Sequence, residues 1–91
     1  MSMFILYIQT GCPYCAVAIR ALDELGLPFE SRNIQSDVYR AELLARGGKI
    51  QVPYFVDTSR NIEMYESADI VKYVQEHYRN HDDSPWSIAS E

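Results

Sequence analysis

The chain has two cysteines, Cys12 and Cys15, and only Pro13 and Tyr14 separate them. Thiols at this spacing can close into a small-ring disulfide and open again into a dithiol. A structural disulfide is uncommon in a reducing compartment, so the spacing favours a redox centre over a cross-link. The sequence therefore predicts thiol–disulfide chemistry at this pair.

The residues around the pair predict a different role for each thiol. An apolar run over Phe4–Ile8 has the length of a buried strand, and a Thr-Gly pair breaks it just before the cysteines. Pro13 suits the first position of a helix, where its missing N–H needs no partner. Cys12 would then lie at a helix N-terminus, where free backbone N–H groups and the helix dipole favour a thiolate. We expect Cys12 to be the nucleophile and Cys15, one turn further on and facing the core, to be the resolving thiol.

The composition is that of one small globular domain, with 91 residues, 47% apolar content and a net charge of −5. The negative charge opposes a nucleic-acid role, which needs a basic face. No segment approaches the roughly 18 to 20 apolar residues of a membrane span, and the N-terminus lacks the pattern of a secretory signal. We expect a soluble, cytoplasmic monomer with neither a nucleic acid nor a membrane as partner.

Hydrophobic spacing and Gly or Pro breaks predict seven elements. In chain order they are a strand over 4–8, a helix over 13–25, a strand over 29–34, a helix over 37–47, strands over 54–56 and 62–65, and a helix over 67–78 capped by Ser67. The polar segment 57–61 has the length of a hairpin connection. The order β-α-β-α-β-β-α predicts an α/β fold with a four-stranded mixed sheet and helices on both faces. This domain would cover residues 1–79, and a polar tail would cover 80–91.

A metal site is an alternative use of the cysteines. His77 and His81 lie four residues apart at the end of the last predicted helix, so a CxxC unit with an HxxxH unit has the ligand types of a zinc site. The stretch between the two units is far too long for a zinc finger. We interpret the histidines as solvated residues at a helix C-terminus, where an imidazole suits the dipole, and we expect no metal.

The motifs together resemble a known family. The Cys-Pro-Tyr-Cys unit after a short strand, Gln51-Val52-Pro53 before the hairpin and the capped last helix look like a dithiol glutaredoxin over about residues 4–79. The element order also fits the thioredoxin-like fold of that family. The resemblance implies a cis proline at Pro53 beside the active site. It also implies that the backbone of Val52 pairs with an extended thiol peptide.

A second resemblance concerns glutathione. Glu66 and Ser67, with Ile70, are similar to the N-terminal domain of glutathione transferases, in which an acid and a serine hold the γ-glutamyl group. The γ-glutamyl carboxylate suits the free N–H groups of Ser67 and Ala68 at a helix N-terminus, and Glu66 could pair with the ammonium. A simple helix cap at Ser67 and a surface acid at Glu66 are the alternatives. The expected glutathione site consists of Tyr14, Gln51, Val52, Pro53, Glu66 and Ser67.

Two positions depart from the glutaredoxin pattern. Gln9 stands three residues before Cys12, where glutaredoxins commonly have Lys or Arg, so one cation that would meet the glycyl carboxylate is absent. Lys49 or Arg46 could supply that charge, or could be solvated loop residues. The Gly-Gly that usually precedes the last helix is replaced by Tyr65-Glu66, a change toward the transferase pattern.

These observations predict a glutathione-dependent thiol–disulfide oxidoreductase that reduces protein disulfides and glutathionylated proteins, with glutathione as electron donor and no other cofactor. One alternative is a redoxin that thioredoxin reductase reduces and that ignores glutathione. A second is an iron–sulfur carrier, in which two chains hold a [2Fe–2S] cluster through Cys12 and two glutathione thiols. A third is a binding module that has lost catalysis, which the intact cysteine pair opposes.

Overall fold

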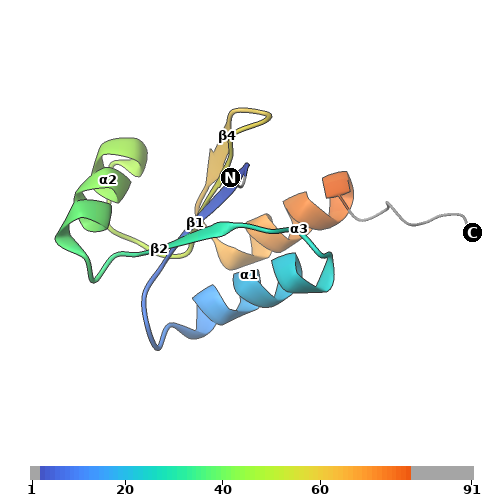
Figure 1. The fold of residues 1–91 in the computed structure, drawn as a ribbon, viewed down its shortest axis with the longest axis horizontal. Helices are drawn as coiled ribbons and strands as arrows, with labels where there is room; N and C mark the ends of the chain where they lie inside the picture. The colour runs from blue at the N-terminus through green and yellow to red at the C-terminus, as the bar shows by residue number, and fades with distance from the viewer. Residues whose placement is uncertain (1–2, 79–91) are drawn as a thin grey trace, which may run out of the picture.

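The computed structural model describes residues 3–78, so the predicted tail and His81 lie outside the described residues. It contains four strands and three helices in the predicted order (Figure 1). They are β1 (Phe4–Ile8), α1 (Pro13–Glu24), β2 (Glu30–Asn33), α2 (Asp37–Gly47), β3 (Tyr54–Asp57), β4 (Ile62–Met64) and α3 (Ser67–Tyr78). No helix in residues 3–78 combines the length and the apolar character that crossing a membrane needs.

The strands form one mixed sheet in the order β2-β1-β3-β4. β1 runs parallel to β2, with Ile5 opposite Glu30, and antiparallel to β3, with Leu6 opposite Phe55. β3 and β4 form the predicted hairpin. The prediction of a four-stranded, thioredoxin-like α/β fold is therefore confirmed.

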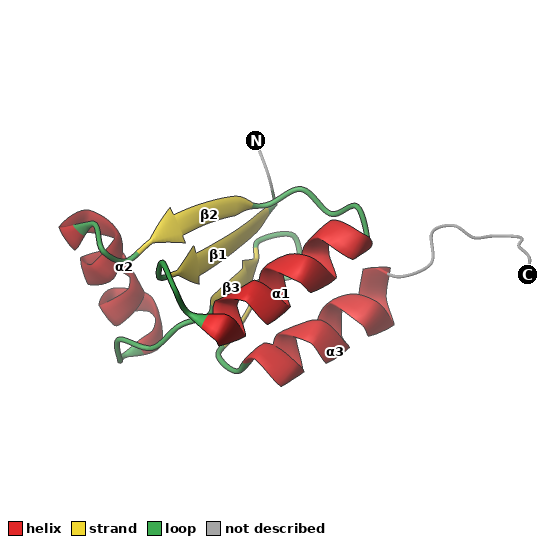
Figure 2. Cartoon of the chain, turned by 90° about the horizontal axis from the view of Figure 1, so that it is seen from below, coloured by secondary structure: helices red, strands yellow, loops and turns green. Residues whose placement is uncertain are grey.

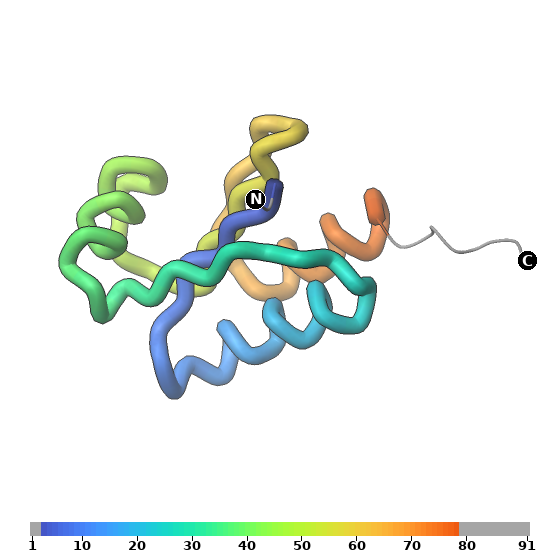
Figure 3. The backbone as a smooth tube through the Cα atoms, in the orientation of Figure 1, coloured from blue at the N-terminus to red at the C-terminus, as the bar shows by residue number. Residues whose placement is uncertain are grey.

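Helices cover both faces of the sheet, as predicted. Successive side chains of a strand point to opposite faces, so β1 contributes Phe4 and Leu6 to one face and Ile5 and Tyr7 to the other. α1 and α3 lie side by side on the first face (Figure 2). Between β2 and β3 the chain passes through α2 on the opposite face (Figure 3). The first face buries Phe4, Leu6, Ala18, Ala21, Leu22, Phe55, Ile70 and Val74, and the second buries Ile5, Tyr7, Ile34, Leu43, Tyr54 and Val56.

The structure corrects several element ends. α1 ends at Glu24, one residue before the predicted end, and β3 extends to Asp57, one residue beyond it. The strand predicted over 29–34 is shorter, Glu30–Asn33, and these four residues pair with Ile5 to Ile8 of β1. The last strand ends at Met64 instead of residue 65. Ser67 is the first residue of α3 and not its cap, since the carbonyl of Glu66 accepts the first helical bond, from the N–H of Ile70 at 3.0 Å.

Candidate functional site

A tight turn delivers the first cysteine to the start of α1. The N–H of Cys12 donates to the carbonyl of Gln9 at 3.2 Å, and Gly11 takes a φ of 84°, which a residue with a side chain rarely adopts. The side chain of Asn33 donates to the hydroxyl of Thr10 at 2.9 Å, which ties the turn to β2. The turn is thus held by its own backbone and by the neighbouring strand.

Cys12 occupies the cap position of α1. Its Sγ accepts the backbone N–H of Cys15 at 3.3 Å, and Pro13 is the first helical residue, as predicted. Both thiols are free, and Cys12 is partly exposed to solvent. This is the position expected for the nucleophile: a solvent-accessible sulfur at a helix N-terminus with a backbone donor directed at it.

Cys15 is in a different environment one turn along α1. It is only 2% exposed and packs in the interior. Burial, followed by the hydrogen bond with Cys12, raises the pKa of the Cys15 thiol to about 12. The thiol is therefore protonated at neutral pH, which agrees with the prediction of a less exposed second cysteine.

A groove of about 460 Å³ lies next to the start of α1. Three segments far apart in the sequence form it: the start of α1, the residues before β3, and the start of α3. Its lining residues are Tyr14, Gln51, Val52, Pro53, Glu66, Ser67 and Ala68. All six residues predicted for glutathione thus lie around one groove. Ala68, whose backbone N–H was predicted to bind the γ-glutamyl carboxylate, also lines it.

At its α3 end, the groove has one group that favours an anion and another that favours a cation. The first backbone N–H groups of a helix have no partner within the helix and favour an anion, whereas the carboxylate of Glu66 favours a cation. The side chain of Gln51 donates to Glu66 Oε2 across the groove at 3.4 Å, and the Val52–Pro53 bond is cis, as the resemblance implied. The groove can therefore hold a group that carries both an ammonium and a carboxylate.

A second hollow, of about 390 Å³, has Cys12 in its lining. Its lining is mostly apolar and comprises Ile8, Gln9, Thr10, Gly11, Cys12, Pro13, Cys15, Ala16 and Ile19. Tyr14 lines the groove and Cys12 lines this hollow, so the start of α1 borders both. The sequence did not reveal this hollow, since Ile8 and Ile19 follow the spacing of ordinary core residues.

The two cations that could have compensated for Gln9 are both engaged elsewhere. Arg46 Nη1 lies 3.0 Å from Glu63 Oε2, and Lys49 Nζ lies 4.7 Å from the ring centroid of Tyr65. Neither residue lines the groove, and Gln9 itself lines the second hollow. The charged side chain in the groove lining is Glu66.

The histidine that the structure describes has a different environment from a metal ligand. His77 Nδ1 lies 3.0 Å from Arg60 Nη1, and its ring packs on Tyr73 with centroids 4.6 Å apart. Across residues 3–78, the structure brings together no group of three or more His, Cys, Asp and Glu side chains that could hold a metal ion.

Comparison with known proteins adds a family and several solved structures. The family model "Glutathione S-transferase, N-terminal domain" matches residues 6–82. A glutathione S-transferase from the Antarctic clam Laternula elliptica is 25% identical over 92% of this chain and 41% of that chain, with a TM-score of 0.73. The glutathione transferase URE2P6 from Phanerochaete chrysosporium, in complex with oxidized glutathione, is 25% identical over 89% of this chain and 39% of its own, with a TM-score of 0.75.

URE2P8 from the same organism, also solved with oxidized glutathione, has a TM-score of 0.76 at 18% identity over 91% of this chain and 39% of that one, and so shows the fold alone. The present chain spans about two fifths of the length of these solved chains. No curated protein matches the sequence.

Proposed function

The chain belongs to the glutathione S-transferase N-terminal domain family, and from this premise we propose that it is a glutathione-dependent thiol–disulfide oxidoreductase. One observation carries the proposal. The free thiol of Cys12, which accepts the N–H of Cys15, lies two residues before Tyr14, which borders a groove of about 460 Å³. The substrates would be protein disulfides and mixed disulfides of proteins with glutathione.

Glutathione would lie in the groove with its γ-glutamyl end at α3. Its α-carboxylate would accept from the N–H groups of Ser67 and Ala68, and its ammonium would face Glu66. The cysteinyl part would run along Val52, and its sulfur would reach Cys12. The complex of URE2P6 with oxidized glutathione, a protein 25% identical to this chain, supports this assignment.

The reduction of a glutathione mixed disulfide needs only Cys12. Its thiolate attacks the glutathione sulfur of the mixed disulfide, the bond to the substrate sulfur breaks, and the released thiolate takes up a proton. A second glutathione thiolate then attacks the glutathione sulfur now bonded to Cys12. This step releases oxidised glutathione and restores the Cys12 thiolate, so one disulfide replaces another at each turnover.

The reduction of a protein disulfide also uses Cys15. Cys12 attacks the protein disulfide and forms a mixed disulfide with it, after which Cys15 loses its proton and attacks the Cys12 sulfur. The protein leaves as a dithiol, and two glutathione molecules reduce the Cys12–Cys15 disulfide and become oxidised glutathione. Because burial raises the pKa of Cys15 to about 12, the second step should accelerate as the pH rises above neutrality. The apolar hollow beside Cys12 would accommodate the part of the substrate that is not glutathione.

A second candidate is glutathione transfer to an electrophile. The match to a transferase domain over residues 6–82 favours it. In that reaction the sulfur of glutathione is itself the nucleophile, and neither cysteine of the protein forms a bond. The two functions therefore differ in whether they require Cys12.

Steady-state reduction of the mixed disulfide of glutathione with 2-mercaptoethanol, coupled to glutathione reductase and NADPH, tests the proposal. We expect turnover that saturates with glutathione, falls by several orders of magnitude in Cys12→Ser and persists in Cys15→Ser, which in turn should lose reduction of a protein disulfide. Conjugation to chlorodinitrobenzene that survives in Cys12→Ser, without disulfide reduction in the wild type, would establish the transferase instead. Turnover with thioredoxin reductase but not with glutathione would leave the thiol chemistry and remove the glutathione site.

A further inference from the structure

The two walls of the groove belong to segments that are only loosely connected in the fold. One wall, residues 51–53, follows the end of α2, and the other, residues 66–68, begins α3. α2 buries a single residue, Leu43, so apolar packing alone holds its C-terminal end weakly. The hydrogen bond that joins the walls, from Gln51 to Glu66, is exposed and 3.4 Å long. Another contact must set the separation of the walls.

Tyr65 makes that contact from the α3 side. Its hydroxyl donates to the backbone carbonyl of Lys49 at 2.8 Å, and the Lys49 ammonium lies 4.7 Å from its ring centroid. The same ring packs on Tyr54 of β3 with centroids 4.5 Å apart. Tyr65 directly precedes Glu66 in the chain. One side chain thus joins the sheet, the turn after α2 and the start of the α3 wall.

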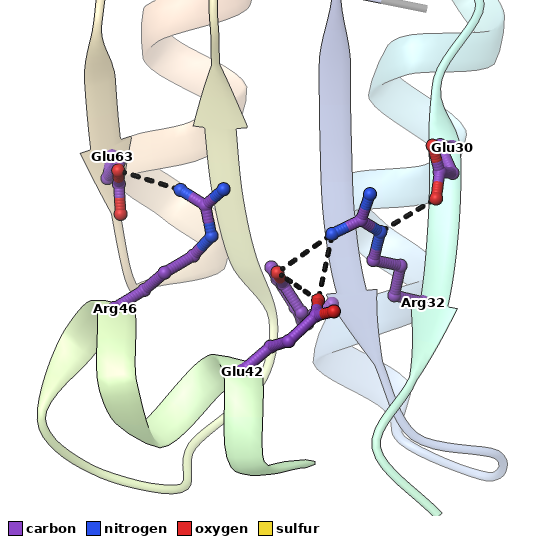
Figure 4. Close-up of polar contacts among 6 residues, drawn as sticks. Glu30, Arg32, Glu42, Arg46 and Glu63 are labelled. Carbon is purple, nitrogen blue, oxygen red and sulfur yellow. Dashed lines mark hydrogen bonds and ion pairs between the residues drawn. The ribbon is translucent and has the colours of Figure 1, made fainter. Parts of the chain in front are cut away.

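Gly47, the last residue of α2, makes room for this side chain. A Cβ on Gly47 would lie 2.1 Å from the Tyr65 hydroxyl oxygen and 2.7 Å from Cζ, well inside contact distance. Its backbone is helical, so glycine is required here by the space that Tyr65 fills and not by a left-handed conformation. Next to it, Arg46 pairs with Glu63 of β4 at 3.0 Å (Figure 4). The end of α2 is thus fitted around Tyr65.

We propose that Tyr65 is a positioning residue for the glutathione groove: by holding residues 47–49 against the start of α3, it sets the separation between Gln51 and Glu66. This inference rests on the proposed function, because it assumes that glutathione lies between these walls. It also gives a physical role to the residue that stands where glutaredoxins have glycine.

Gly47→Ala tests the proposal because it pushes Tyr65 away without weakening α2, since alanine is the better helix former. We expect the Kd for glutathione, measured by calorimetry, to rise about tenfold, whereas Tyr65→Phe, which removes only the hydroxyl bond, should raise it about fivefold. In a Tyr65→Leu background, adding Gly47→Ala should change the Kd less than about twofold, because the clashing side chain is gone. In all of these Gly47 and Tyr65 variants, the rate at which iodoacetamide alkylates Cys12 should stay at the wild-type value.

Tyr73→Phe is the matched control, since it removes a hydroxyl that donates to Asp57 at 2.7 Å on the other face of the sheet, and it should leave the Kd for glutathione unchanged. If Gly47→Ala and Tyr65→Phe bind glutathione as the wild type does, the positioning role is overturned. If the wild type itself does not bind glutathione, the proposed function fails. Amide hydrogen exchange over residues 48–52 then still decides the role of Tyr65: faster exchange in Gly47→Ala supports it, and unchanged exchange refutes it.

Discussion

The two faces of the sheet are held to their helices by different interactions. On the face of α1 and α3, eight residues form a continuous apolar cluster, and Leu6, Leu22 and Phe55 are fully buried. On the face of α2, the helix itself contributes one buried residue, Leu43. Cys12 is attached to the first face through α1, and the Gln51 wall of the groove follows the helix on the second. The thiol is thus carried by the firmly packed face and the groove wall by the looser one.

Polar side chains supply much of the attachment of α2 (Figure 4). Arg32 of β2 donates to Glu42 of α2 at 2.8 Å, to Glu30 at 2.7 Å and to the Tyr7 hydroxyl at 3.3 Å. The Tyr7 hydroxyl in turn donates to Glu42 at 3.0 Å. Ion pairs respond to salt, whereas apolar contacts of buried side chains do not weaken in the same way. We therefore expect that salt can loosen the groove wall under conditions that leave the thiol in place.

The largest expected effect is on the free energy of unfolding, and it should differ between the two faces of the sheet. Leu22→Ala should lower the free energy of unfolding by about 3 kcal/mol, because it leaves a cavity between α1 and the sheet. Leu43→Ala should cost about 2 kcal/mol and accelerate amide exchange in α2 while α1 stays protected. Urea unfolding and residue-resolved hydrogen exchange measure both. If amide exchange increases equally in α1 and α2 for both variants, the two faces do not differ in how firmly they hold their helices.

A second prediction concerns the buried carboxylate on the α1 and α3 face. Asp57 is fully buried and accepts hydrogen bonds from Tyr73 at 2.7 Å, from Tyr78 at 2.5 Å and from Ser59. Burial raises the pKa of Asp57, but the bonds from Tyr78, Ser59 and Tyr73 together hold it below its ordinary value. The ionised form is therefore the stabilising one. Its contribution is complete above the unfolded-state pKa of about 4 and is lost as the pH falls through the lower folded-state pKa.

Asp57→Asn should accordingly lower the free energy of unfolding by about 2 kcal/mol at neutral pH. It should also flatten the loss of stability as the pH falls below about 4, which urea titrations at each pH would record. Tyr73→Phe should give a smaller loss of about 1 kcal/mol, since it removes one of the donors. A variant that loses stability in acid as steeply as the wild type would show that another carboxylate is responsible.

The smallest expected effect tests the polar attachment of α2. Arg32→Met should cost about 1 kcal/mol and should accelerate amide exchange in α2, as should about 1 M NaCl in the wild type. Arg40→Met is the control, because the pair of Arg40 with Asp37 lies within α2 and is exposed, so it should cost less than about 0.5 kcal/mol. If Arg40→Met accelerates amide exchange in α2 as much as Arg32→Met does, the ion pair of Arg32 does not hold α2 on the sheet.

Local sequence was enough to predict the thiol end of the site. The position of Cys12 at the helix start depends on Pro13, on the N–H of Cys15 and on the turn from Gln9, all within three residues of it along the chain. Interactions this local are nearly the same in any fold that continues the helix, so residue type and spacing predict them. The order of elements followed for the same reason, because strand and helix periods are properties of short segments.

The groove beside the start of α1 required more than local pattern. That residues 51–53 meet Glu66 and Ser67 was expected only from resemblance to known families, and the second hollow beside Cys12 was not expected at all. The residues of β2 are polar and do not alternate between apolar and polar types, so the sequence did not predict the length of this strand. The contact of Tyr65 with Gly47 joins positions 18 apart, and neither residue type signals the other. Sequence by itself determined the thiol pair and the elements that carry it. The shape of the groove was decided by tertiary structure, because it depends on how α2 and α3 pack on one sheet.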